Sequence, residues 1–190
     1  MRHSNNKPKS SVQSVGTLTP PALEIRNATE KELKRVANVI KEAYEEYAVN
    51  FSPEGWRGYS ENIQDVASRF GKAEILVAVK ARKIVGTLTL YPNGKDNDWP
   101  ARWAGLRLLA VAPAYRGQGI ARALMDKAIA RSRKRGSTTI GLHTTEMMAV
   151  AQQIYIRMGF ARAPRYDFHP RPGMTVMAYK MPLRKTRSED

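Results

Sequence analysis

The chain has 190 residues, no cysteine and a formal net charge of +15 at pH 7. This length suits one domain with its own core, and the lack of cysteine excludes disulfides, thiolate metal sites and a cysteine nucleophile. The amino terminus lacks the apolar run of a secretory signal and no segment approaches a membrane span, so we expect a cytoplasmic protein with no membrane partner.

The two ends of the chain differ in composition from its body. Residues 1–20 are rich in Ser, Asn, Lys and Pro, which predicts a disordered basic tail. Residues 184–190 form a second, flexible charged tail by the same reasoning. The expected domain therefore covers residues 21–183.

The first half of this domain begins with a short strand over residues 23–26. Thr29 and Glu32 form a capping box, which opens a helix that is expected to run to about Tyr47. A second helical region is expected from Pro53 to about Phe70, where Gly71 can end it.

The spacing of apolar residues then changes from the helical period to the period of two that is typical of strands. Residues 74–79 and 84–91 are joined by a short charged link, which predicts an antiparallel hairpin. A loop over residues 92–100 leads to a buried strand over residues 106–111.

A glycine-rich turn follows that strand and precedes a helix. Gly117 and Gly119 allow backbone conformations that a Cβ would obstruct, and apolar spacing from Ile120 predicts a helix that ends near Gly136. Because the first N–H groups of a helix have no intrahelical partner, this turn is suited to hold a phosphate.

The last third of the chain contains two further strands and a helix. A strand is expected over residues 139–143 and a helix over residues 146–158, with Val150 and Tyr155 on its core side. A loop over residues 164–173 leads to a closing strand over residues 176–181.

This order of elements predicts an α+β fold with a mostly antiparallel sheet. The strands over residues 106–111 and 139–143 flank a crossover helix, so they are expected to be parallel. If these two strands separate, a ligand can lie between them with its phosphates on the glycine turn.

The glycine turn does not match the two commonest nucleotide-binding loops. A P-loop requires Lys-Ser/Thr after the glycine, whereas Ile120 and Ala121 follow Gly119. A dinucleotide-binding turn requires a third glycine, and that position is Arg122.

The remaining pattern resembles the acyl-CoA pyrophosphate loop of the GNAT acetyltransferase superfamily. It consists of Arg116-x-x-Gly119-x-Ala121 after Leu109-Ala110-Val111. A helix that carries Tyr155 and ends in Gly159-Phe160 is similar to a second signature of that family. The resemblance covers about residues 23–183 and implies a twisted, mostly antiparallel sheet flanked by helices, with acyl-CoA bound where the central parallel strands splay.

The resemblance also implies a reaction and a set of site residues. The reaction is transfer of an acetyl group from acetyl-CoA to an amine by direct attack, with Tyr155 as general acid and no metal. The implied pantetheine contacts fall on Leu109, Ala110 and Val111. The implied pyrophosphate contacts fall on Arg116, Gly117, Gln118, Gly119, Ile120, Ala121 and Arg122.

The chain departs from the family pattern at the acceptor side. Gly105 stands where many members have a glutamate base, and Met148 stands where many have an asparagine. His143 is our preferred substitute base, and Glu146, at the expected start of the next helix, is the second choice. Asp167 and His169 in the late loop are further candidates. The resemblance also suggests an acceptor pocket near the first two helices, lined by Tyr44, Tyr47, Trp56 and Tyr59.

Two other classes of function stay open. The missing glutamate favours a catalytically silent acyl-CoA-binding or sensor domain. A charge of +11 in the body, densest at Lys127, Arg131, Arg133, Lys134 and Arg135, would suit nucleic acid, but no aromatic-studded basic face accompanies it. We therefore expect an amine acceptor and no nucleic acid, and a homodimer is allowed. The acceptor can be an antibiotic, a polyamine, an amino acid, a peptide N-terminus or a lysine.

Overall fold

The computed structural model describes residues 22–171 and 173–183, and the two predicted tails lie outside these residues. The strands are β1 (Glu24–Asn27), β2 (Glu74–Lys80), β3 (Lys83–Tyr91), β4 (Trp103–Val111), β5 (Thr139–Thr145), β6 (Ala161–Arg162), β7 (Phe168–Arg171) and β8 (Met174–Pro182). The α-helices are α1 (Leu33–Tyr44), α2 (Pro53–Gln64), α3 (Ile120–Lys134) and α4 (Ala149–Arg157). None of the helices described is long and apolar enough to cross a membrane.

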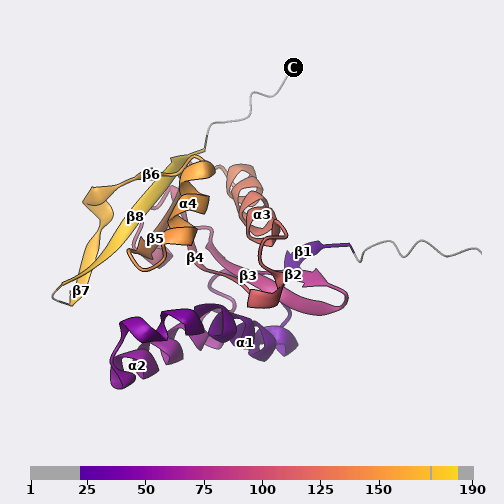
Figure 1. The fold of residues 1–190 in the computed structure, drawn as a ribbon. Helices are drawn as coiled ribbons and strands as arrows, with labels where there is room; N and C mark the ends of the chain where they lie inside the picture. The colour runs from indigo at the N-terminus through magenta and orange to yellow at the C-terminus, as the bar shows by residue number, and fades with distance from the viewer. Residues whose placement is uncertain (1–21, 172, 184–190) are drawn as a thin grey trace, which may run out of the picture.

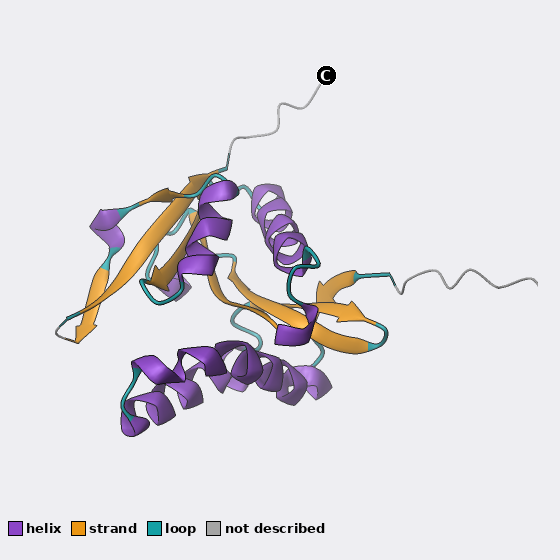
Figure 2. Cartoon of the chain, viewed as in Figure 1, coloured by secondary structure: helices purple, strands orange, loops and turns teal. Residues whose placement is uncertain are grey.

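The strands form one sheet in the order β1-β2-β3-β4-β5-β8-β6, with β7 paired to β8. Helices α1 and α2 lie on one face of this sheet, and α3 and α4 lie on the other (Figures 1 and 2). Only β4 and β5 pair in parallel, and every other pairing is antiparallel among the strands described. The predicted α+β class is thus confirmed.

The parallel pair β4–β5 is short. It runs from Trp103 opposite Thr139 to Leu106 opposite Leu142 and then stops. Beyond that point β4 continues to Val111 along β3, while β5 continues along β8. The two strands therefore separate in the middle of the sheet, as the sequence analysis expected.

A bulge in β4 lies directly after the separation. The register between β3 and β4 shifts here, and Leu108 adopts a φ of +54°, which is rare for a residue with a branched side chain. The bulge re-aims the side chains that follow, so that Leu108 and Ala110 pack toward α1 while Leu109 packs toward α3.

The core has one layer on each side of the sheet. Leu76, Leu88 and Leu106 face α3, where Leu124 and Met125 are fully buried. On the opposite face, Ile75 and Val77 pack against α1 through a second set of buried residues, Val36, Val39, Ile40 and Tyr44. Burial of this kind contributes about 1.5–3 kcal/mol for each large apolar side chain.

Several element boundaries differ from those expected. The capping box is present, but it opens a 3₁₀ turn before α1, and α1 passes into 3₁₀ helix at Glu45. Helix α2 ends at Gln64 rather than near Phe70, because Asp65 leaves the helical conformation and its carboxylate accepts a hydrogen bond from the Ser68 N–H. The prediction that this helix continues to Phe70 and ends at Gly71 was therefore wrong.

The second half of the chain also differs in detail. Strand β4 begins at Trp103, three residues early, and β5 extends to Thr145 because its pairing with β8 continues that far. Helix α4 therefore begins at Ala149 instead of Glu146. The late loop holds β7, and the two-residue strand β6 was not foreseen.

The side chain of Trp99 packs on the sheet over two paired glycines. Gly105 and Gly141 lie opposite each other in the β4–β5 pair, and the indole of Trp99 covers both. A Cβ on Gly141 would lie 2.7 Å from the indole ring, and a Cβ on Gly105 would lie 2.4 Å from the Asn97 amide nitrogen. Glycine is therefore required at both positions by close approach.

We expect Gly141→Ala to lower the free energy of unfolding by about 1–3 kcal/mol, because the added methyl group overpacks against a ring that is 97% buried and cannot move aside. Urea unfolding measures this loss. Gly58→Ala is the control: residue 58 lies within α2 with nothing within 4 Å, so alanine should stabilise by about 0.5–1 kcal/mol. Equal effects at the two positions would contradict the argument.

Candidate active site

A cavity of about 510 Å³ lies beside the end of β4, beyond the point where its pairing with β5 stops. Four parts of the chain line it: the end of β4, the glycine turn with the start of α3, α4 with the turn before it, and the end of α1 with the 3₁₀ turn after it. The predicted site residues on its wall are Leu109, Ala110, Val111, Arg116, Gly117, Gly119, Ile120, Ala121, Arg122 and Tyr155. Positions far apart in the sequence thus meet at one cavity.

The glycine turn presents free backbone donors to this cavity. Gly117 and Gly119 have φ of +73° and +75°, and a Cβ on either would meet open space. Gly119 is the N-cap of α3 and supplies no side-chain cap; the first hydrogen bond of the helix runs from the Ala123 N–H to the Gly119 carbonyl. The preceding N–H groups therefore remain available to an anion.

The charged side chains of the turn are already engaged. Arg116 makes a bidentate ion pair with Glu46, with nitrogen–oxygen distances of 3.1 and 2.8 Å, and also donates to the Ala43 carbonyl. Arg122 pairs with Asp126 at 3.0 Å. An anion at this turn would therefore meet mainly backbone N–H groups, because Arg116 ties the turn to the end of α1.

Gln118 is the one predicted loop residue that does not line the cavity. Its side-chain oxygen accepts a hydrogen bond of 2.6 Å from the Lys80 ammonium group on β2. Glu46 lies on the cavity wall but was missed by the sequence analysis. It is 70 residues from Arg116, and no local spacing signals such a pair.

Tyr155, on α4, lines the cavity. Its side chain is 92% buried, and its hydroxyl makes no hydrogen bond within the described part of the chain. Burial raises the pKa of this phenol, with a further rise from Tyr47, so the group is neutral and remains a hydrogen-bond donor at physiological pH. Val150 on the same helix was expected in the core but is 74% exposed and faces the cavity.

His143 lies outside this cavity, within β5 rather than at its end. Its ring stacks on Trp99 with 4.5 Å between ring centres, and Nε2 is 2.9 Å from the Tyr166 carbonyl. Because a carbonyl only accepts, Nε2 carries the proton and Nδ1 is the basic nitrogen of the neutral ring. Burial lowers the pKa of His143, so the ring is neutral near pH 7.

Glu146 lies in the turn between β5 and α4, not in the first turn of the helix. It lines a second cavity of about 330 Å³ between the link from α1 to α2, this turn and the start of β8. The remaining residues of this wall are Asn50, Phe51, Thr145, Met147, Gly173, Met174 and Thr175.

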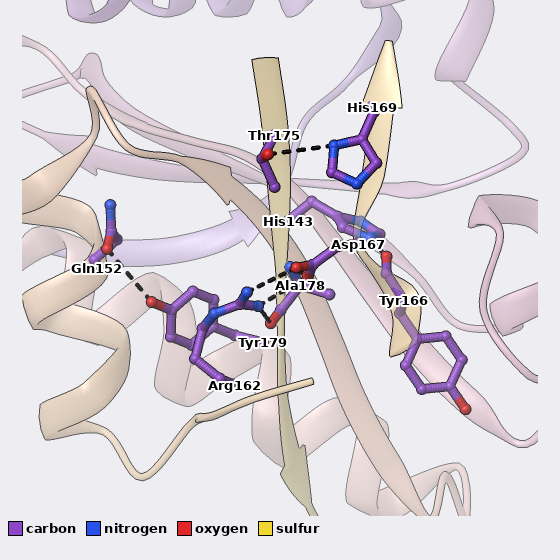
Figure 3. A network of polar contacts seen from close by, with 9 residues as sticks. All are labelled: His143, Gln152, Arg162, Tyr166, Asp167, His169, Thr175, Ala178 and Tyr179. Carbon is purple, nitrogen blue, oxygen red and sulfur yellow. Dashed lines mark hydrogen bonds and ion pairs between the residues drawn. The ribbon is translucent and has the colours of Figure 1, made fainter. Parts of the chain in front are cut away.

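The late loop uses its polar residues to hold β7 and β8 together (Figure 3). Asp167 makes a bidentate ion pair with Arg162 and accepts a hydrogen bond from the Ala178 N–H, which lowers the pKa of its carboxyl group to about 2. His169 contacts the Thr175 hydroxyl at 3.2 Å. With so low a pKa, Asp167 is a poor proton acceptor and mainly a structural residue.

Other side chains fill the space that a glutamate base at position 105 would need. A side chain at Gly105 would collide with Asn97 and Trp99, so a glutamate could not fit without displacing both. Met148, at the position of the usual asparagine, is buried on the cavity wall. The packing of the protein therefore accommodates the residues present at both positions, Gly105 and Met148.

The arrangement of the sheet and helices is that of known acetyltransferase structures. Residues 37–160 match the acetyltransferase (GNAT) family, which is more than half of the chain, and the chain belongs to this family. The N-acetyltransferase PaiA of Thermoplasma acidophilum, solved in complex with coenzyme A, aligns with a TM-score of 0.65 at 19% identity. That alignment covers 84% of this chain and 99% of the other.

Curated relatives share a shorter region. N-acetylaspartate synthetase of Xenopus tropicalis is 34% identical over 99 residues, which is 52% of this chain and 35% of that protein. N-acetyltransferase 8B of Rattus norvegicus is 34% identical over 90 residues, which is 47% of this chain and 40% of the relative. The matched region thus spans well under half the length of these relatives.

Proposed function

We propose that this chain transfers an acetyl group from acetyl-CoA to an amine by direct attack. The observation that carries the proposal is the 510 Å³ cavity, which brings the backbone of Leu109–Val111, the glycine turn and the Tyr155 hydroxyl to one place. Family membership and the coenzyme A complex of a structural neighbour support it.

The residues present fit the donor. The uncapped start of α3 offers N–H groups and the positive end of a helix dipole to the pyrophosphate, and the open space at Gly117 and Gly119 admits close approach. Beyond Leu106, the edge of β4 that faces β5 has no strand partner, so its backbone can pair with an amide-rich arm. Acetyl-CoA supplies an activated thioester carbonyl.

The protein is then expected to stabilise the negative charge that develops during the reaction, on the carbonyl oxygen and on the departing sulfur. A backbone N–H of residues 109–111 stabilises negative charge as it develops on the carbonyl oxygen. The Tyr155 hydroxyl donates a hydrogen bond to the departing sulfur; its raised pKa makes complete proton transfer unfavourable. The tyrosine thus acts on the leaving group by hydrogen bonding.

An alkylamine has a pKa near 10.4 and arrives protonated, so it must lose a proton before attack. We propose His143 as the base. It projects two residues beyond Gly141 on the face that carries Gly105, and its Nδ1 is free to accept a proton. Glu146 remains the second choice, at the adjoining cavity.

A silent acyl-CoA-binding domain is the second candidate function. The packing of Asn97 and Trp99 over Gly105 favours it, since it removes the place of the usual base. Calorimetry with coenzyme A and a screen of amines for coenzyme A release separate the two functions. Binding without release from any amine would favour the silent domain.

Gly119→Ala should weaken coenzyme A binding about 10-fold or more, because alanine disfavours the left-handed conformation that aims the N–H groups of the turn. Gly136→Ala is the matched control. It lies at the other end of α3 with φ of +77° and equally open space, so it costs similar stability without touching the cavity. Calorimetry measures both affinities, and equal losses would contradict the assignment.

Tyr155→Phe should lower kcat about 10- to 100-fold while the KM for acetyl-CoA changes less than about 3-fold, because the hydroxyl acts on charge that forms during reaction. Tyr179→Phe is the control. That tyrosine is buried beside Tyr155, donates to Gln152 and does not line the cavity. An unchanged kcat for Tyr155→Phe from pH 6 to 9 would remove the tyrosine from the mechanism.

In the wild-type protein, kcat/KM should fall as the pH drops through the lowered pKa of His143, below about 6.5, since protonation removes the base. His143→Asn should abolish this acid limb and lower kcat/KM about 10- to 100-fold at pH 7.5, with coenzyme A affinity unchanged. An acid limb that survives in His143→Asn and disappears in Glu146→Gln would transfer the role to Glu146.

A further inference from the structure

Arg107 is an exposed arginine in the middle of the central strand β4. Its neighbours Gly105 and Leu106 are buried, and it lies opposite the buried Thr89 of β3. Side chains two apart on a strand share a face, so Arg107 projects on the face that carries Gly105, Trp99 and α1. Solvent therefore reaches this face of the sheet at its centre.

Arg107 lies near groups from three elements, since Tyr44 and Tyr59 pack in one cluster with Leu108, the next residue of β4. Burial raises the pKa of Tyr59, on α2, to about 12, and the Arg107 charge opposes that rise. Burial also raises the pKa of Tyr44 on α1, and the Arg107 charge opposes that rise; at His143 on β5 the same charge adds to the lowering of the pKa by burial. Arg107 thus lies in the space between the first two helices and β5.

A second guanidinium lies beside this space. Arg69 is 92% buried, and its nitrogens donate to the backbone carbonyls of Asp65 and Asn62. Burial lowers its pKa, Tyr91 opposes this, and the Arg107 charge lowers it further. Two positive groups thus repel each other, and hydrogen bonds to backbone fix one of them.

Arg107 has no ion-pair partner in the part of the chain that the structure describes, whereas the Asp65 carboxylate offsets part of the Arg69 charge. The ion pairs there involve Arg26, Arg116, Arg122, Arg131, Arg135 and Arg162. The Arg107 side chain also makes no hydrogen bond within residues 22–171 and 173–183. Arg107 therefore keeps a positive charge that a bound anion would offset.

Arg107 and the proposed base lie on the same face of the sheet. Gly105 and Gly141 pair across β4 and β5, and Arg107 and His143 each follow two residues later on these strands. An amine that gives its proton to His143 therefore has its other substituents near Arg107.

We propose that Arg107 binds a carboxylate of the acceptor, so that the substrate is an amine with a carboxylate a few bonds from its nitrogen, as in a free amino acid. The inference rests on the proposed acetyl transfer. A guanidinium matches a carboxylate through two parallel hydrogen bonds, and the neutral hydroxyls of Tyr44 and Tyr59 offer further donors.

The test compares acceptors that differ only in charge. Glycine, leucine, phenylalanine and glutamate are each paired with the compound whose carboxyl groups are primary amides. Coenzyme A release from acetyl-CoA gives kcat/KM for each. We expect the wild-type protein to favour the best acid over its amide at least about 10-fold, and Arg107→Gln to lower kcat/KM for that acid about 10- to 100-fold. Its amide should change less than about 3-fold.

Arg133→Gln is the matched control, because it removes the same charge from an exposed position on α3, on the opposite face of the sheet. It should retain the preference for the acid. The inference is wrong if amides react as well as acids, or if Arg107→Gln affects both compounds of a pair equally.

A binding measurement separates this inference from the proposed function. The same acids are titrated by calorimetry into protein saturated with coenzyme A. Acids that bind in an Arg107-dependent manner without any turnover would uphold the carboxylate site and reject acetyl transfer. Turnover of amines regardless of charge would uphold acetyl transfer and reject the carboxylate site. Acids that neither bind nor react would reject the carboxylate site outright.

Discussion

The end of the β4–β5 pairing at Leu106 and Leu142 is the constraint on which the site depends. A parallel pair that continued would close its backbone groups on each other and leave no room for a ligand. Because β4 turns with β3 and β5 turns with β8, the two strands separate into a cavity whose wall includes unpaired backbone. The bulge at Leu108 and the start of α3 lie directly after the separation, so the groups that we propose for recognition of the donor are backbone atoms.

The same two strands explain the unusual acceptor side. Where they still pair, glycines face each other at 105 and 141, and Trp99 lies across both. The indole then provides a surface on which the His143 ring stacks, and the Tyr166 carbonyl fixes which nitrogen of that ring is protonated. The absence of a glutamate at position 105 and the presence of His143 on the next strand therefore belong to one packing arrangement. This arrangement leaves the buried indole N–H of Trp99 without a hydrogen-bond partner among the described residues, which costs free energy of folding.

The sequence predicted the fold class and the elements that form the donor cavity, because strand periodicity, two glycines and a tyrosine helix are local signals. Contacts between distant residues could not be predicted in this way. The pair Arg116–Glu46 joins positions 70 residues apart, and α2 ends where Asp65 finds a hydrogen bond rather than at the next glycine. The start of α4 was misplaced because the pairing of β5 with β8, a tertiary interaction, outweighed the helix signal at Glu146.

The charges on the acceptor face form a consistent set. The face that carries Gly105 also carries Arg107, and the Asp167 carboxylate is already paired with Arg162. The Arg107 charge disfavours an ammonium group and so assists deprotonation of an incoming amine, while burial, with a smaller contribution from Arg107, lowers the pKa of His143 and keeps it neutral. The same charge would repel a polyamine, whose remaining charges have no carboxylate to meet beside Arg107. Under the proposed reaction, the absence of a glutamate at position 105 therefore affects which amines can enter as well as which group accepts the proton, and an acceptor that carries its own negative charge satisfies both conditions.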